Sequence, residues 1–130
     1  MNKILSLLVV LAMVFSAAFS EGADWLFFIQ NSKGDKYYLD MESITHVSAD
    51  LVRVVRKVEL KDSTAISSVV SDMEVDCKEA KLRTLRETTH YKGGKTSIRV
   101  TDSGLTPAAS DDIADMLTEL VCSLRRHDKD

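Results

Sequence analysis

The sequence has no excess of basic residues: 17 Lys and Arg stand against 20 Asp and Glu, a formal net charge of −3. Nucleic acids and anionic membrane surfaces both favour partners with a basic footprint. The mildly acidic balance therefore argues against either as the main partner. The sequence also contains no internal repeat, no low-complexity tract and no linker with a shift in composition, which favours a single folded domain.

The motifs of common enzymes and metal sites are also absent. His46, His90 and His127 have no metal-ligand spacing between them, so we expect no metal site. There is no Gly-x-Ser-x-Gly elbow, and no serine is paired by motif with a histidine. The aspartates within residues 111–115 fit the start of a helix better than a calcium loop. We therefore expect neither an enzyme nor a cofactor-binding protein.

One long apolar run is present, at the N-terminus. Lys3 opens it, residues 4–19 carry no charge, and residues 16–20 supply the small side chains that a signal peptidase requires. The run is shorter than the roughly 20 apolar residues of a typical membrane-spanning helix. We therefore predict a secretory signal peptide over residues 1–20.

Cleavage after Ser20 fits best, with Ala18 and Ala23 as alternative last residues of the signal. No cysteine lies at the cut, so a lipid anchor of the lipoprotein type is not expected. The rest of the chain, residues 21–130, has the length of one small domain. We expect an exported protein, periplasmic or at the cell surface, with no transmembrane span after cleavage.

Cysteine is scarce, with only Cys77 and Cys122 present. Behind a signal peptide, two cysteines indicate an oxidising compartment in which a disulfide forms and persists. A bond that closes the long loop from Cys77 to Cys122 would stabilise the fold by on the order of 4 kcal/mol in the chain-entropy model. The alternative is two free thiols, which is the commoner case in cytosolic proteins.

The clearest helix signal covers residues 110–124, where apolar side chains recur at steps of three and four. Ser110 stands at the expected N-cap. On an ideal helix Cys122 lies nearly opposite the centre of the apolar stripe, so a bridge to an inward-facing Cys77 would require a frayed or tilted last turn, or a helix end that lies among the strands. The stripe consists of Ile113, Met116, Leu117, Leu120, Val121 and Leu124.

Strand patterns fill the region before this helix. Residues 51–60 alternate most clearly, with valines of one parity facing a core and Arg56 as the exception. Residues 78–90 are ambiguous between helix and strand, but their threonines and the Lys92-Gly93-Gly94-Lys95 turn favour a strand entering a hairpin. The other strands are predicted at residues 25–29, 36–40, 44–47, 69–77 and 96–102, with loops at 61–68 and 103–107.

These elements predict an α+β fold class. We expect an antiparallel sheet of about five or six strands, a C-terminal amphipathic helix packed on it, and one disulfide as a staple. Cys77 shares the apolar parity of its strand and should face inward. Trp25 is expected in the core.

Exposed aromatic and basic side chains are the candidate partner contacts. Tyr37 and Tyr38 are neighbours in one strand, so one faces the core and the other faces water, where it is the better contact candidate. An uncovered sheet edge would favour pairing with a second copy or with an extended peptide. A basic group around the 92–95 hairpin would suit an acidic partner, although an ordinary solvated strand face is the alternative. It consists of Arg83, Arg86, Lys92, Lys95 and Arg99.

Short motifs lie in a fixed order along nearly all of the predicted domain: Trp25, Tyr37-Tyr38-Leu39-Asp40, Ser43-Ile44, Val52, Val54, Lys57, Asp76-Cys77, Pro107, Ser110 and Val121-Cys122. In order and spacing, this set resembles the surface-adhesin protein E family of bacterial exported proteins. The resemblance implies a small antiparallel sheet, a helix packed on it, and a disulfide that joins sheet to helix. It also implies an exported, non-enzymatic protein. The founding member binds host matrix and serum proteins.

The functional expectation follows from these observations and the resemblance. We expect an exported binding module that contacts a protein partner, from the host matrix or the bacterial envelope, through a sheet face or edge. A homodimer is one outcome of edge pairing. The alternative is a structural or envelope-accessory protein with no dedicated ligand.

Overall fold

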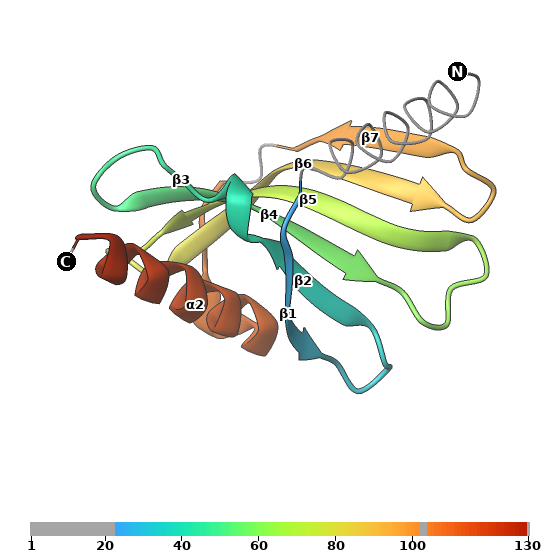
Figure 1. The fold of residues 1–130 in the computed structure, drawn as a ribbon, viewed down its shortest axis with the longest axis horizontal. Helices are drawn as coiled ribbons and strands as arrows, with labels where there is room; N and C mark the ends of the chain where they lie inside the picture. The colour runs from blue at the N-terminus through green and yellow to red at the C-terminus, as the bar shows by residue number, and fades with distance from the viewer. Residues whose placement is uncertain (1–22, 102–103, 130) are drawn as a thin grey trace, which may run out of the picture.

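The computed structural model describes residues 23–101 and 104–129, so the predicted signal peptide lies outside the described residues. Within these ranges the chain forms an antiparallel sheet and one α-helix, α2 (Asp112–Lys129). Figure 1 shows α2 lying against one face of the sheet, toward the end where the β3 segment lies. The predicted α+β class is confirmed.

Six strands follow one another across the sheet in the order β1-β2-β4-β5-β6-β7, each antiparallel to its neighbour. Their bounds are Trp25–Gln30 (β1), Lys36–Asp40 (β2), Leu51–Glu59 (β4), Ile66–Asp76 (β5), Lys81–Tyr91 (β6) and Thr96–Val100 (β7). Two short strands complete the sheet: β3 (Thr45–His46) pairs with β4, and β8 (Thr106–Pro107) pairs with β6. Two 3-10 turns, η1 (Met41–Ser43) and η2 (Ala108–Ser110), connect them to the neighbouring elements.

Two of the predicted loops proved partly wrong. β5 begins at Ile66, inside the predicted loop 61–68, because its pairing with β6 continues to Tyr91. The serines in this segment have no strong strand propensity, and the ladder to the neighbouring strand overrides their composition. In the same way, β8 forms inside the predicted loop 103–107, where it pairs with the start of β6.

The alternation predicted for β4 is confirmed. Val52, Val54 and Val58 are buried, whereas Arg53 and Glu59 are exposed. Because successive side chains of a strand point to opposite faces, these residues define the two sides of the sheet. The valines lie on the side covered by α2, which we call the helix side, and the other side is the open face.

Arg56 is the predicted exception, a cation with the same parity as the buried valines. Its guanidinium lies over the Tyr37 ring, 5.7 Å from the centroid. Burial lowers the pKa of Arg56, while the nearby groups of Tyr37, Glu87 and Asp111 act in the opposite direction. Arg56 and Tyr37 therefore both belong to the helix side.

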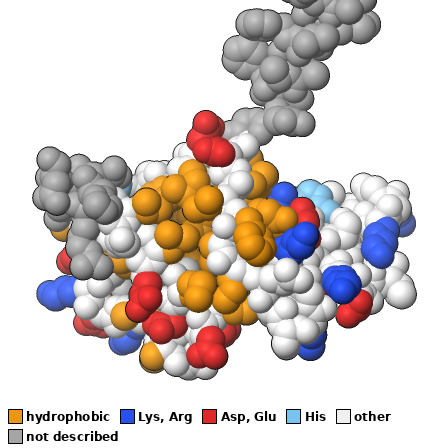
Figure 2. Space-filling model, turned by 60° about the horizontal axis from the view of Figure 1, so that its bottom comes forward, with side chains coloured by type: hydrophobic (Ala, Val, Ile, Leu, Met, Phe, Trp, Pro, Cys, Tyr) orange, Lys and Arg blue, Asp and Glu red, His pale blue; other side chains and the backbone are white. Residues whose placement is uncertain are grey.

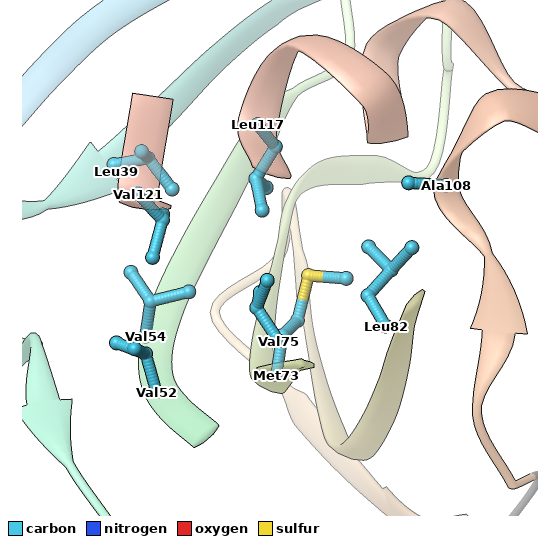
Figure 3. Packing of buried hydrophobic residues seen from close by; sticks show 9 residues of the cluster. All are labelled: Leu39, Val52, Val54, Met73, Val75, Leu82, Ala108, Leu117 and Val121. Atoms are coloured by element: carbon cyan, nitrogen blue, oxygen red, sulfur yellow. The ribbon is translucent and has the colours of Figure 1, made fainter. Parts of the chain in front are cut away.

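The core lies between α2 and this side of the sheet. Figure 3 shows side chains of α2 and of the strands pointing toward one another, with Ala108 of η2 at the margin. Close packing of this kind is the main source of stability in a small domain. The buried residues of the cluster are Leu39, Val52, Val54, Met73, Val75, Leu82, Ala108, Leu117 and Val121.

The N-cap of α2 is Asp111, so the predicted cap at Ser110 was wrong. The Asp111 carboxylate accepts a hydrogen bond from the Ile113 amide at 2.9 Å, and its carbonyl accepts one from the Asp115 amide at 2.9 Å. Ser110 belongs to η2 instead, and its hydroxyl donates to the Pro107 carbonyl at 2.8 Å. A carboxylate at this position both caps the amides and meets the positive end of the helix dipole.

The buried stripe of α2 is rotated from the predicted one. Leu117 and Val121 are fully buried and Thr118 is buried beside them, whereas Met116 is 42% exposed. Since each helical residue advances by roughly 100°, this rotation brings Cys122 to the flank of the buried stripe. Cys122 packs against the core cluster, so the bridge needs no frayed turn.

The predicted disulfide is confirmed. Cys77, one residue beyond β5, is bonded to Cys122 with an S–S distance of 2.09 Å and a Cα–Cα distance of 5.7 Å. Cys77 also donates its backbone amide to the Asp50 carbonyl at 2.8 Å. The bridge thus links the end of a central strand to the helix.

The predicted hairpin between β6 and β7 is also present. The Tyr91 amide donates to the Lys95 carbonyl at 2.9 Å, and the Gly94 amide donates to the Tyr91 carbonyl at 3.0 Å. Gly94 has a φ of 94°, a conformation that glycine adopts without a steric penalty. This turn sets the register of β7 on β6.

Candidate functional site: the open face of the sheet

Two aromatic rings contact one lysine on the open face, and a third ring packs against one of them. The Lys57 ammonium lies 4.5 Å from the centroid of the Trp25 ring and 5.0 Å from that of Tyr38. Phe27 packs edge-on against Tyr38 with centroids 5.7 Å apart, and it remains 49% exposed. Lys57 also pairs with Glu59 at 3.6 Å. These contacts hold the rings in fixed positions on an accessible surface. We call Trp25, Phe27, Tyr38 and Lys57 the aromatic cluster.

The two candidate tyrosines lie on opposite sides of the sheet. Tyr38 is on the open face, where its hydroxyl donates to the Glu59 carboxylate at 3.3 Å. Partial burial raises the pKa of Tyr38, and the charge of Glu59 adds to the effect. Tyr37 is on the helix side, where its ring packs against Phe28 with centroids 6.2 Å apart. Of the two, Tyr38 is therefore the one that is part of the open face.

Trp25, expected in the core, is half-buried in the aromatic cluster instead. It lies on β1, the outermost strand, and has the parity that faces away from α2. Sequence reasoning also did not single out Phe27 or Lys57 as site residues. Strand alternation could have identified the aromatic residues. Trp25 and Phe27 are two residues apart in β1 and therefore share a face, whereas the adjacent Tyr37 and Tyr38 of β2 face opposite sides.

The structure does not gather the predicted basic residues into one patch. Arg83 and Arg86 lie on the open face, Arg99 lies on the helix side, and Lys92 and Lys95 occupy the hairpin turn at the end of the sheet. The three arginines are paired with carboxylates on neighbouring strands, which compensates their charge. The pairs are Arg83 with Glu74 at 2.7 Å, Arg86 with Asp72 at 2.7 Å, and Arg99 with Glu87 at 3.1 Å.

Glu74 is the buried member of these pairs and lies between two arginines. Arg53 donates its Nε–H to the Glu74 carboxylate at 3.2 Å, and Arg83 donates its Nε–H at 3.0 Å. Glu74→Gln is expected to lower the free energy of unfolding by about 1–3 kcal/mol, because the charge-assisted hydrogen bonds of two arginines are weakened at once. Urea denaturation of both proteins measures the change.

Glu59→Gln is the matched control, since Glu59 is an exposed partner of Lys57. An exposed ion pair contributes little, so we expect a change below about 1 kcal/mol. Equal effects of the two substitutions would show that the burial of Glu74 does not increase its contribution to the free energy of unfolding.

A groove of about 460 Å³ lies on the open face farther along the sheet. Charged and apolar side chains alternate around it, a lining that suits an extended peptide better than a purely apolar ligand. Ser43 of η1 also lines the groove, and its hydroxyl accepts a hydrogen bond from the Val55 amide at 2.8 Å. The groove is lined by Arg53, Val55, Asp72, Leu85, Arg86 and Val100, among others.

The helix side also exposes apolar surface. Figure 2, which brings the lower side of Figure 1 forward, shows hydrophobic side chains gathered across the middle of the molecule. Leu26 of β1 pairs with the buried Leu39, so it lies on the helix side, and it is 41% exposed. With Met116 of α2, Leu26 supplies comparison positions for binding experiments.

The described residues contain no cluster of three or more His, Cys, Asp or Glu side chains that could hold a metal ion. His46 lies on β3 and His90 on β6. Within the same described ranges, no helix has the length and apolar character needed to cross a membrane.

Together these features define a small disulfide-linked α+β domain in which a helix covers one face of the sheet and no described helix covers the other. The chain belongs to the surface-adhesin protein E family, whose model matches residues 25–123. The matched span includes both bridged cysteines, and it confirms the resemblance inferred from the motifs. Membership indicates an adhesin-like surface protein and a binding role without catalysis. No match was found among curated proteins or among solved structures.

Proposed function

We propose that the protein is an exported binding module that contacts a protein partner through the open face of its sheet. The observation that carries this proposal is the aromatic cluster, in which Lys57 contacts Trp25 and Tyr38, and Phe27 packs against Tyr38, on a surface that α2 does not cover. Tyr and Trp are enriched among the residues that dominate binding energies, and Phe is enriched at interfaces. The family assignment supports the same role.

The cluster is already ordered before any partner arrives. β1 and β2 pair along their length, and the Asp24 amide donates to the Asp40 carboxylate at 3.0 Å at their open end. Lys57 contacts two of the rings from the neighbouring strand β4. Since ordering side chains on binding costs free energy, a cluster that is fixed in advance binds more tightly.

The disulfide supports an exported location, because such bonds persist in oxidising compartments. The proposed signal peptide at residues 1–20 supports it as well. The partner would then be a protein of the bacterial envelope or of the host matrix, met in the periplasm or at the cell surface.

The open face can be tested with Phe27→Ser combined with Tyr38→Ser. Binding of the purified protein to immobilised envelope extract and to matrix proteins should be saturable, and the double substitution should weaken it at least about tenfold. Leu26→Ser with Met116→Ser is the matched control. It removes a similar exposed apolar surface from the helix side and should leave the dissociation constant unchanged.

Two results would contradict the proposal. Loss of binding in the helix-side variant alone would put the contact on the other face. The lack of any saturable partner would instead favour the envelope-accessory alternative. Proteinase treatment of intact cells separates the locations, because protection of the protein would make adhesion at the cell surface untenable.

A further inference from the structure

β7 is the outermost strand at one side of the sheet (Figure 1), and no described strand pairs with its outer side. All of its residues are exposed. Ile98 is 64% exposed and Val100 is 79% exposed. Two large apolar side chains on one short strand therefore meet solvent at the edge of the sheet.

Two backbone hydrogen bonds, one just beyond each end of β7, show which residues of β7 bond to β6. The Tyr91 amide donates to the Lys95 carbonyl and the Thr101 amide to the Leu85 carbonyl, both at 2.9 Å. Between these two bonds, the register of β6 on β7 has no shift. Because hydrogen-bonded pairs alternate in an antiparallel ladder, the odd-numbered residues of β7 are the ones that face β6.

The even-numbered residues therefore face the other way. Thr96, Ile98 and Val100 direct their backbone N–H and C=O groups to the outer side of β7. Such a row of backbone donors and acceptors is a template for another strand.

The opposite edge of the sheet is different. β1 contains a register irregularity between Phe27 and Ile29, and a bulge of this kind disrupts strand addition. β7 has no bulge, no proline and no lysine within it. Neither strand contains proline or lysine, so the two long edges differ in the irregularity, which interrupts β1 and is absent from β7.

The sequence of β7 is complementary to itself. We propose that β7 pairs antiparallel with β7 of a second copy about a two-fold axis at Ile98, which joins the two sheets into one. In this register Ile98 meets Ile98 of the second copy, and Thr96 meets Val100. Arg99 lies opposite Ser97, so no like charges face each other directly, and Arg99 is already paired with Glu87 at 3.1 Å.

This register satisfies the outer backbone groups of all three even-numbered residues in each copy. A two-fold axis of this kind is perpendicular to the sheet, so the two open faces lie on the same side. Val100 lines the groove on the open face, and the two grooves then approach the joint from both sides. The pairing does not depend on the proposed function, but a dimer would present two binding surfaces together.

Sedimentation equilibrium of the processed, exported protein tests the pairing. A concentration-dependent monomer–dimer equilibrium is expected, and Ile98→Lys should raise its dissociation constant at least about tenfold by placing two like charges opposite each other. Ile98→Pro should act similarly, since it removes an outward N–H group without removing a bond to β6. Leu26→Lys, which places the same charge on β1, is the control and should leave the equilibrium unchanged.

Cross-linking tests the register separately. It uses single cysteine substitutions, which add no charge to β7. Ile98→Cys should form covalent dimers with a short bismaleimide, because its Cα atoms would lie roughly 5.5 Å apart. Thr96→Cys and Val100→Cys should cross-link when the two proteins are mixed, and much less when each is alone. Leu26→Cys should give no covalent dimer.

A protein that stays monomeric at all concentrations would overturn the proposal. A dimer that is insensitive to Ile98→Lys would also overturn it. Growth into larger assemblies that depend on Leu26 would show head-to-tail pairing of β1 with β7 instead of a closed two-fold dimer. Circular dichroism of each variant confirms that the fold is retained.

Discussion

Replacing Cys77 and Cys122 together with serine is expected to lower the free energy of unfolding by about 4 kcal/mol. The two cysteines are 45 residues apart in the sequence, and their bond closes this long loop in the unfolded chain. Without the bond, the unfolded chain gains conformational freedom, while the native packing of α2 on the sheet is retained. For a domain of this size, such a loss is a large part of the total stability.

Urea denaturation with and without a reducing agent measures the effect. The serine variant should unfold at a much lower urea concentration, and reductant should move the wild-type midpoint close to that of the variant. Reductant should not change the variant itself, which serves as the control. A loss below about 1 kcal/mol would mean that helix packing alone holds the domain together.

Leu117→Ala is the second substitution with a large expected effect, a loss of about 2–5 kcal/mol. Leu117 is fully buried between α2 and the sheet, where it belongs to the same cluster as Val54 and Val75. Truncation removes its apolar contacts and leaves a cavity that the strands can only partly fill, because they are held by their ladders.

Met116→Ala is the matched control, since Met116 precedes Leu117 in the same helix and is largely exposed. Its truncation should change the free energy of unfolding by less than about 1 kcal/mol. Comparable losses at the two positions would contradict the rotated helix face that the structure shows. Urea midpoints of the two variants, measured side by side, decide between these outcomes.

Local patterns were sufficient for most of the strands. In β4 the valines alternate with charged residues, and the buried parity of Val52, Val54 and Val58 follows from this pattern. The hairpin before β7 followed from its glycines. β5 was predicted to start too late because its first residues have a loop-like composition, and only their pairing with β6 makes them a strand.

The candidate site was less predictable. Adjacent positions in one strand showed that Tyr37 and Tyr38 face opposite sides, but not which side α2 would cover. Lys57 contacts Trp25 across β2, which lies between β4 and β1, and this strand order is a property of the tertiary structure. The basic residues near the hairpin looked like a patch in sequence, yet Arg99 and Arg83 each meet a carboxylate across the sheet, a contact set by strand register.

The sequence by itself determined the strand alternation, the amphipathic helix and the pairing of the only two cysteines, since each depends on residue spacing or on number. Tertiary structure decided which stripe of α2 is buried, which tyrosine lies on the open face and which sheet edge has no register irregularity. The helical pattern of apolar residues was broad enough to allow several rotations of α2. Packing of Leu117 and Val121 against the strands, together with the bond at Cys122, selected one of them.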